Sequence, residues 1–436
     1  MTDTLPPHLD AFVREHAGDI TGTRHPGGGA SRITWLIDTV QRQCVLRQDS
    51  GDGPVANTPL TLKREAIAYR ALANTSVRIP CLLAETGDAL LMEMAAGTPD
   101  LDGLTPEARA AVLDDYVDAL ADLHQIAPGA AFAGLDPPTS AADAAASQVR
   151  LWSGIYRSRV RRASPLAEFT SRWLERTAPT DTERLVICHG DVGPGNFLHD
   201  DERVTALLDW EFVHVGDPMD DLAWLVFRGH HFSANVGDFD AQLARWKAHT
   251  GYAIDRRRIA WYRINVMYIW LVSSLAALDN GAANQDRFTY LNLVTLMNVL
   301  IPRAVMEYEG RPVPDTDTAI KCEDNELSEA LAALVDLLAL KWQGDSGQHM
   351  YVALMTQQIH DLARMQTAIG AGAAAAVAEL MGTPVAADDW QRAFTEWIRR
   401  TDSQRTVEVL YSNGLRRIQA SPAVHPVADK PFIKLI

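Results

Sequence analysis

The segment from Val186 to Trp224 constrains this chain more than any other stretch of its 436 residues. It opens with an apolar run typical of a buried strand, which ends in a His-Gly-Asp sequence whose last residue is Asp191. Asn196 follows five residues later, and a second apolar run leads to Asp209. We therefore expect two strands whose adjoining loops bring carboxylate and amide side chains together.

These side chains are the ones that phosphoryl transfer requires. The reaction needs a carboxylate to orient the attacking hydroxyl and oxygen ligands to hold Mg²⁺ against the phosphates. We predict that Asp191 is the catalytic base or hydroxyl-orienting group, and that its work is mostly alignment, because an unperturbed carboxylate is a weak base for an alcohol. Asn196 and Asp209 are the predicted Mg²⁺ ligands. Glu211 would reach the metal directly or through water.

Three further residues of the segment are predicted to support the loop. His189 would brace it by hydrogen bonding, and Asp217 and Asp221 would accept hydrogen bonds from loop or helix N–H groups, since Asp beside Gly and Pro often caps a helix. A Gly-Asp pair after a strand is more often a simple turn. The prediction therefore depends on the whole succession of HGD, NFL, DWE and GDPMDDLA.

The spacing of the segment resembles the catalytic loop of kinase-like phosphotransferases, in which HxDxxxxN is followed by a metal-binding Asp. Because Asp209-Trp210-Glu211 replaces the DFG of protein kinases, the resemblance is to the aminoglycoside phosphotransferase superfamily. It implies an α+β, bilobal protein-kinase-like fold with a β-rich N-terminal lobe and a helical C-terminal lobe. An all-α helical domain would follow at the C-terminus.

A longer part of the chain, about residues 20–310, resembles one branch of that superfamily. VLRQDSGDGP, REAIAYRAL, VRIPCLLAE, LLMEMAAGTP and LADLH occur in the order typical of phosphotransferase domains beside or fused to acyl-CoA dehydrogenases. These domains are similar to hydroxyacyl-CoA kinases. The resemblance implies ATP-dependent phosphorylation of a hydroxyl group on an acyl-CoA or a hydroxy acid, which makes that hydroxyl a better leaving group.

A glycine-rich segment over residues 25–32 precedes a candidate strand. Glycines let backbone N–H groups approach phosphates closely, and Gly28, Gly29, Ser31 and Arg32 are the predicted contacts. The alternative is that three successive glycines form only a turn.

Arg47, at the end of a Val-Leu-Arg sequence, occupies the place of the phosphate-binding lysine of kinases. Its permanent charge and bidentate fork suit phosphate, and arginine is usual there in the resembling branch. A surface arginine at a strand end is the alternative. Glu65 would pair with Arg47, unless it is a solvated helix carboxylate. Adenine is expected to bond to main-chain atoms near Glu93 and Met94.

Hydrophobic periodicity divides the chain into three parts. An N-terminal nucleotide-binding lobe is predicted over residues 1–96, with strands at 33–36, 43–46 and 89–94 and a helix at 62–72. A catalytic and acceptor-binding lobe is predicted over residues 97–315, with helices at 105–125, 149–159, 165–176 and 264–278. Thr105 is the predicted N-cap of the helix at 105–125, and Pro106 is its first residue.

Residues 320–436 are predicted to form a helical accessory domain. The composition changes to turn-forming and charged residues around 312–317, and amphipathic helices are expected at 325–342, 350–369 and 388–400. The segment resembles a small helical domain associated with these kinases. Alternatively, it would stabilise the enzyme or form a homodimer. The tail after Ser421 is expected to be extended.

Composition limits the partners and the compartment. A net charge of −16 argues against a nucleic-acid partner, because such binding depends on clustered Lys and Arg. The four cysteines form no CxxC pair, and the N-terminus lacks a basic region followed by an apolar segment, so a cytoplasmic protein with reduced thiols is expected. The longest apolar stretch, residues 264–278, is shorter than the ~20 residues of a membrane span and is expected to be a buried helix.

The expected cofactors are ATP, or another nucleoside triphosphate, and Mg²⁺, and the expected acceptor is a small molecule. Two other functions stay open. One is an antibiotic kinase acting on a macrolide or an aminoglycoside, although a polycationic aminoglycoside favours an acidic cleft and residues 220–320 hold 11 acidic and 10 basic residues. The other is a non-catalytic nucleotide-binding pseudokinase, against which the joint presence of Asp191, Asn196 and Asp209 argues.

Overall fold

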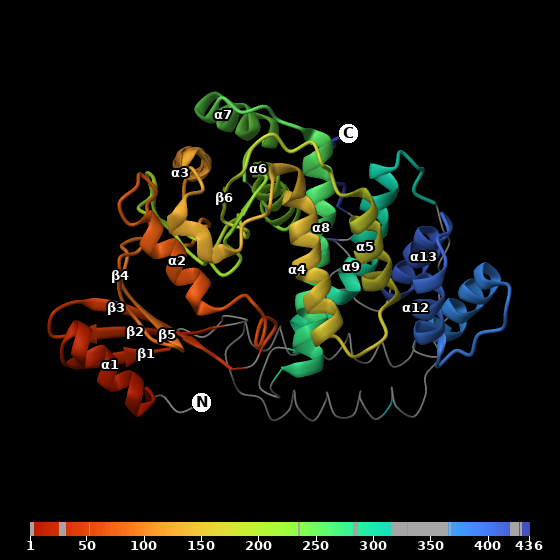
Figure 1. Ribbon diagram of the computed structural model, residues 1–436, viewed down its shortest axis with the longest axis horizontal. Helices are drawn as coiled ribbons and strands as arrows, with labels where there is room; N and C mark the ends of the chain where they lie inside the picture. Colours follow the sequence, from red (N-terminus) through yellow and green to blue (C-terminus); the bar gives the residue numbers. More distant parts are fainter. Residues whose placement is uncertain are drawn as a thin grey trace.

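The computed structural model describes most of the chain. The described residues are 4–25, 32–51, 53–233, 236–281, 287–314, 368–418 and 430–436, together with residues 329, 365 and 427. Figure 1 shows a small lobe of strands and two helices at one side of the molecule, and helices that fill the remainder. The predicted α+β kinase-like fold is confirmed, with a β-rich N-terminal lobe and a helical C-terminal lobe.

The N-terminal lobe is built on a five-stranded sheet with strand order β1-β2-β3-β5-β4, in which neighbouring strands are antiparallel. Its elements are α1 (Pro7–Ala17), β1 (Ile20–Arg24), β2 (Arg32–Thr39), β3 (Gln43–Asp49), α2 (Leu62–Leu72), β4 (Leu82–Glu85) and β5 (Ala89–Glu93). The three predicted strands correspond to β2, β3 and β5, and the predicted helix at 62–72 is α2. The prediction omitted α1, β1 and β4.

The two faces of this sheet have different neighbours, because side chains alternate along each strand. Cys44 and Leu46 of β3 are buried in one hydrophobic cluster with Leu9 and Val13 of α1. Arg47, the next residue along β3, therefore projects from the opposite face. That face is turned toward α2 and the C-terminal lobe, where the predicted catalytic residues lie.

The C-terminal lobe combines long helices with two small antiparallel sheets, β6 with β9 and β7 with β8. Its first helices are α3 (Pro106–Gln125), η1 (Ala130–Leu135), η2 (Ala141–Asp143), α4 (Ala144–Arg159) and α5 (Pro165–Thr177). The strands are β6 (Val186–Cys188), β7 (Phe197–His199), β8 (Val204–Leu207) and β9 (His214–Gly216). The later helices are α6 (Pro218–Trp224), the π-helix η3 (Leu225–His231), α7 (Phe239–Thr250), α8 (Arg256–Asn280) and α9 (Arg287–Tyr308).

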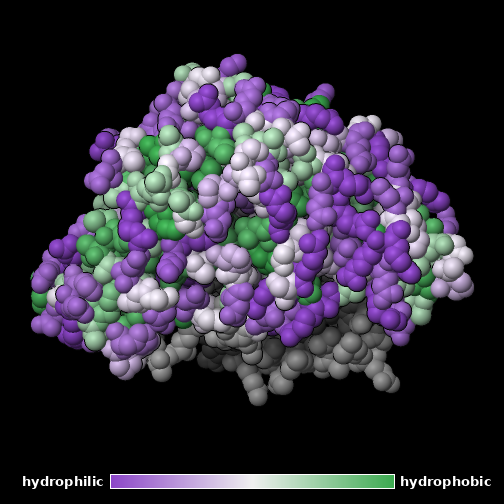
Figure 2. Space-filling view, in the orientation of Figure 1, coloured by the Kyte–Doolittle hydropathy of each residue, from purple (hydrophilic) through white to green (hydrophobic). Residues whose placement is uncertain are grey.

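Local signals set the beginnings of two of these helices. The Thr105 hydroxyl accepts a hydrogen bond from the backbone N–H of Ala108 at 3.2 Å, and Pro106 is the first residue of α3, as the sequence predicts. α4 begins five residues before the predicted start, because the alanines at 144–146 favour a helix over the predicted loop. Figure 2 shows mostly hydrophilic residues on this face of the molecule, with hydrophobic ones gathered between the N-terminal lobe and α4.

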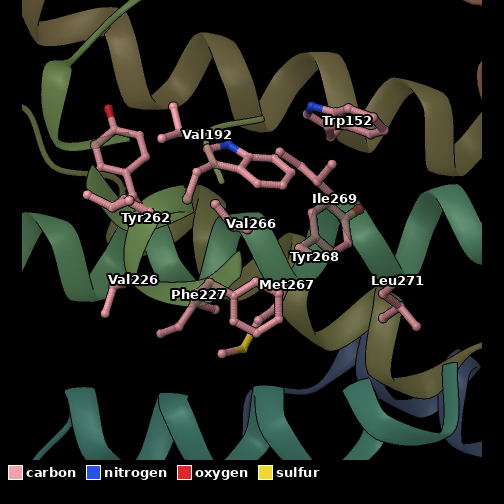
Figure 3. Close-up of a cluster of buried hydrophobic side chains, with 14 of the residues drawn as sticks. Trp152, Val192, Val226, Phe227, Tyr262, Val266, Met267, Tyr268, Ile269 and Leu271 are labelled. Carbon is pink, nitrogen blue, oxygen red and sulfur yellow. The ribbon is translucent and has the colours of Figure 1, made fainter. Parts of the chain in front are cut away.

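α8 is the central helix of the C-terminal lobe. It is buried along most of its length, which confirms the buried helix predicted at 264–278. Figure 3 shows Val266 and Ile269 of α8 packed in one cluster with Trp152 of α4 and Val192 of the loop that carries Asp191. Among the described helices, α9 is the one long and apolar enough to cross a membrane, and 56% of its most apolar window is buried within the protein.

The described C-terminal helices pack directly on the C-terminal lobe. After a helix at Ala368–Met381, α12 (Trp390–Arg400) contacts α5, and α13 (Thr406–Ile418) contacts α9. α12 corresponds to the helix predicted at 388–400. The helix predicted at 325–342 and most of that at 350–369 lie outside the described residues. The division into three domains stays a prediction.

Candidate active site

The catalytic loop, residues 189–196, connects β6 to β7 along a backbone path that requires glycine. Gly190 has a φ of 80°, and a Cβ at this position would lie 2.3 Å from the carbonyl oxygen of Phe212. Asp209, after β8, is a non-glycine residue with a φ of 63°. A left-handed backbone costs energy at such a residue and persists where the surrounding structure holds it in place, often at active sites.

Asp221 anchors the start of the catalytic loop. Its carboxylate accepts hydrogen bonds from the backbone N–H groups of His189 at 2.7 Å and Gly190 at 2.8 Å. It also accepts the Nε2–H of His124 at 3.0 Å, and the Nδ1 of His124 accepts the indole N–H of Trp246 at 3.0 Å. Burial alone would raise the pKa of Asp221, but these donors outweigh it and hold the pKa below its usual value. The buried carboxylate is therefore charged and fully engaged.

His189 joins the catalytic loop to the residues that precede Asp209. Its Nε2 lies 2.7 Å from the carbonyl oxygen of Leu208, and its Nδ1 accepts the backbone N–H of Asp191 at 3.2 Å. This pattern assigns the ring proton to Nε2 and occupies both nitrogens. The geometry is the bracing arrangement that the sequence predicts, and it leaves no ring nitrogen to act as a base.

Asp191 is enclosed by two donors. Its Oδ2 lies 2.6 Å from an Nη of Arg228 and accepts the amide N–H of Asn196, also at 2.6 Å. Burial raises the pKa of Asp191, with a further increase from Asp209, while Arg228, His189 and Asn196 act in the opposite direction. A raised carboxyl pKa brings the group nearer to what a general base needs.

Arg47 joins the two lobes by ion pairs. One Nη donates to Oδ1 of Asp209 at 2.7 Å, and the Nε lies 3.3 Å from Oε2 of Glu65 on α2. Glu65 is completely buried. The predicted Arg47–Glu65 pair is thus present. Partial burial would raise the pKa of Asp209, but Arg47 outweighs this effect and holds the pKa below its usual value. Glu211 lies close enough to add to the field that raises the pKa of Arg47.

Arg32 has a supporting position. Its guanidinium is buried, donates to Oε1 of Glu65 at 3.0 Å and to the carbonyl oxygen of Leu60 at 2.9 Å, and lies 3.7 Å from Asp49. Through these contacts Arg32 holds Glu65, the partner of Arg47. Direct phosphate contact by Arg32 stays a prediction. The predicted contacts Gly28, Gly29 and Ser31 lie outside the described residues.

At the predicted adenine site, two backbone donors are already used. The N–H of Glu93 donates to the carbonyl oxygen of Cys81 at 2.9 Å, and the N–H of Met94 donates to the backbone carbonyl oxygen of Gln43 at 3.1 Å. The Glu93 carboxylate pairs with Arg42 at 2.5 Å. A base could therefore bond to carbonyl oxygens here, or to N–H groups that follow Met94.

The predicted metal ligands offer the oxygen atoms that Mg²⁺ prefers. Asp209 is one-third exposed at its side chain, and Asn196 follows Asp191 in the same loop. The amide oxygen of Asn196 lies 3.4 Å from Arg228, and the backbone carbonyl of Asn196 accepts the N–H of Leu208 at 2.8 Å, which ties Asn196 to the segment that leads into Asp209. The donor set of one carboxylate and one amide oxygen fits Mg²⁺. Asp217 caps α6 by accepting the N–H of Met219 at 3.0 Å, as predicted.

Two residues of the site were not identified from the sequence. The phenol of Tyr116 on α3 accepts the N–H of Gly193 at 2.9 Å. Arg228 on η3 contacts Asp191 although it lies 37 residues further along the chain. The one sequence feature related to this contact is the pair of glycines at 193 and 195, which leaves room for the Arg228 side chain. A Cβ on Gly193 would lie 2.8 Å from the Cβ of Arg228.

The site combines the Arg47–Glu65 pair with the catalytic loop that carries Asp191. The sequence of the chain matches a known family. Residues 21–262 match the model of the phosphotransferase enzyme family, known as APH. The chain belongs to this family. Membership in this family supports the predicted phosphotransferase reaction.

Similar APH-family sequences occur in larger proteins. Acyl-CoA dehydrogenase family member 10 of Mus musculus is 29% identical over 235 residues, which are 51% of this chain and 22% of the mouse protein. Member 11 of Rattus norvegicus is 28% identical over 258 residues, which are 53% of this chain and 33% of the rat protein. The chain thus matches a third or less of these relatives.

Solved structures show the same fold. A Ralstonia eutropha protein assigned to the aminoglycoside phosphotransferases has a TM-score of 0.51 and 23% identity, covering 69% of this chain and 96% of its own. The choline kinase LicA from Streptococcus pneumoniae has a TM-score of 0.50 and 17% identity, covering 70% of this chain and 99% of its own. At these identities the likeness concerns the fold, and the acceptor has to be argued separately.

Proposed function

We propose that this chain is an ATP- and Mg²⁺-dependent kinase that phosphorylates a hydroxyl group of a hydroxyacyl-CoA or a hydroxy acid. The observation that carries the proposal is the Arg47–Asp209 ion pair between the lobes, 2.7 Å long, beside the buried and oriented carboxylate of Asp191. Together these residues provide a phosphate-binding cation, a metal-binding carboxylate and a group that orients the acceptor.

Each residue then has a chemical task. Asp191 accepts a hydrogen bond from the acceptor hydroxyl and directs its oxygen toward the γ-phosphorus of ATP. As that oxygen–phosphorus bond forms, the bond to the β,γ-bridging oxygen breaks, the hydroxyl proton passes to Asp191, and ADP leaves. Asn196 and Asp209 would hold Mg²⁺, which when bound neutralises charge on the phosphates. Arg47 would hold the α- and β-phosphates with its planar fork.

Two observations support an acyl-CoA or hydroxy-acid acceptor. The relatives named above are acyl-CoA dehydrogenase family members, and the matched part covers half of this chain. The nearly balanced charge of residues 220–320 gives no acidic region for a polycationic antibiotic.

The experiment that tests this proposal is ATP-dependent phosphate transfer to a panel of acceptors, with product masses as the readout. The panel contains hydroxyacyl-CoAs of different chain length, free hydroxy acids, an aminoglycoside and a macrolide. We expect a phosphorylated acyl-CoA or hydroxy acid with the wild type and none with Asp191→Asn. The control is Asp201→Asn, at an exposed turn where asparagine suits the φ of 71°.

Two results would contradict the proposal. Transfer confined to the aminoglycoside or the macrolide would identify an antibiotic kinase. Nucleotide binding without transfer to any acceptor would identify the non-catalytic pseudokinase.

A further inference from the structure

The C-terminal tail, residues 430–436, reaches back to the segment that carries Arg228. The ammonium group of Lys430 donates to the backbone carbonyl oxygens of His230 at 2.6 Å, His231 at 3.0 Å and Ser233 at 3.2 Å. The carbonyls of His230 and His231 lie at the C-terminal end of η3, where helix carbonyls lack intrahelical donors, and that of Ser233 lies two residues beyond it. A cation at that position satisfies them and interacts favourably with the helix dipole.

η3 extends from this capped end to the catalytic loop. Arg228 donates to the backbone oxygens of Asp191 at 3.1 Å and Pro194 at 3.2 Å, in addition to its ion pair with the Asp191 carboxylate. The carbonyl oxygen of Arg228 accepts the hydroxyl of Ser233 at 3.3 Å. Ser233 is thus bonded both to Arg228 and to Lys430, so a short run of polar contacts joins the tail to Asp191.

The tail is held at several other points. The ring of Phe432 contacts the guanidinium groups of Arg263 and Arg303, which lie 4.2 Å and 4.8 Å from its centroid, and its centroid lies 5.1 Å from that of the His231 ring. Arg263 also donates to the carbonyl oxygen of Ile433 at 3.3 Å. Because the tail is fixed on α8 and α9, Lys430 holds η3 against a rigid support.

We propose that the C-terminal tail is a working part of the active site, in which Lys430 is a positioning residue that fixes η3 so that Arg228 orients the carboxylate of Asp191. η3 is a π-helix, and π-helical turns are rare and frequently found at functional sites. The role assigned to Asp191 rests on the proposed function. The contact between tail and catalytic loop does not depend on which acceptor is used.

The test compares four variants of the full chain. Lys430→Met removes the ammonium group and keeps an unbranched side chain, and Lys430→Arg keeps a cation. Arg228→Gln removes the contact with Asp191. Lys434→Met is the matched control, because Lys434 is an exposed lysine of the same tail. The readouts are kcat and KM for ATP, and backbone amide exchange of residues 190–196 and 225–233.

We expect Lys430→Met to lower kcat about tenfold with KM for ATP within about twofold, because small misplacements of a catalytic group lower the rate whereas the nucleotide contacts of Arg47 are untouched. Amide exchange of both segments should rise. Lys430→Arg should restore most of kcat, and Lys434→Met should match the wild type.

A double-mutant cycle decides whether Lys430 acts through Arg228. If it does, Arg228→Gln combined with Lys430→Met loses no more kcat than Arg228→Gln alone. The proposal would be overturned if the kcat losses of the two single variants multiplied in the double variant. It would also be overturned if Lys430→Met left either kcat or amide exchange unchanged. Failure of the wild type to phosphorylate any acceptor would instead refute the proposed function, and the exchange data would still decide the link between tail and loop.

Discussion

The charged residues of this site lie in ion pairs that are largely shielded from solvent. Replacing one partner therefore leaves the charge of the other uncompensated. Arg47 bonds to both Asp209 and Glu65. Arg47→Met should lower kcat/KM for ATP about 10²–10³-fold, since a preorganised cation at the phosphates is lost. Steady-state kinetics at saturating acceptor measures this effect. Arg47→Lys should recover part of the lost kcat/KM. Arg24→Met, at an exposed residue of β1, is the control and should leave kcat/KM unchanged. Equal losses in Arg47→Met and Arg24→Met would contradict the role assigned to Arg47.

The buried charge of Asp221 allows a prediction of how one residue affects the free energy of unfolding. Because its pKa is depressed in the folded protein, its charge stabilises the fold above the unfolded pKa, and this stabilisation is lost as the pH falls through the folded pKa. Asp221→Asn should lower the free energy of unfolding by about 3 kcal/mol at pH 7, as expected when a buried charged partner is removed. The difference should persist down to about pH 5 and shrink below about pH 4.

Urea unfolding at several pH values measures this difference. Glu202→Gln, at an exposed turn, is the control and should change stability by less than about 0.5 kcal/mol. A difference between Asp221→Asn and the wild type that grows as the pH falls would contradict the assigned charge state.

At the scale of elements, the contact of α13 with α9 depends on one glycine. A Cβ on Gly414 would lie 2.1 Å from the carbonyl oxygen of Asn298, whereas a Cβ on Gly154 of α4 would meet nothing within 4 Å. Gly414→Ala should destabilise the protein by about 1–3 kcal/mol through overpacking. Gly154→Ala should stabilise it by about 0.5–1 kcal/mol, because alanine favours a helix. Thermal unfolding of both variants measures these opposite changes in stability. A change of the same sign in both variants would contradict the close packing of α13 on α9 at Gly414.

Elements and their order followed from local signals, whereas contacts between distant elements did not. The apolar spacing of Leu62–Leu72 and the cap at Thr105 are properties of a few adjacent residues. Arg228 and Lys430 have no such signal among their own neighbours in the sequence, because the fold brings their partners close: Arg228 contacts the carboxylate of Asp191, and Lys430 contacts backbone carbonyls. His124, the partner of Asp221, was missed for the same reason: a histidine inside a helix gives no indication of what it contacts.

For the whole molecule, the question is whether residues after 314 form a separate unit. Among the residues that the structure describes after 314, Val407 and Leu410 of α13 belong to the same hydrophobic cluster as Leu296 and Val299 of α9. A chain ending at residue 314 should therefore unfold more than about 10 °C below the full chain, since each kcal/mol of lost packing lowers Tm by about 2–4 °C. An unchanged Tm would support the independent accessory domain that the sequence predicts.

The most direct measurement compares nucleotide binding with phosphate transfer in Asp191→Asn. In the proposed reaction, Asp191 orients the acceptor, whereas Arg47, Asp209 and Asn196 serve the nucleotide and its metal. We therefore predict that Asp191→Asn binds ATP within about twofold of the wild type and transfers phosphate about 10²–10⁴-fold more slowly. Transfer within a few-fold of the wild type, or loss of ATP binding together with transfer, would contradict it.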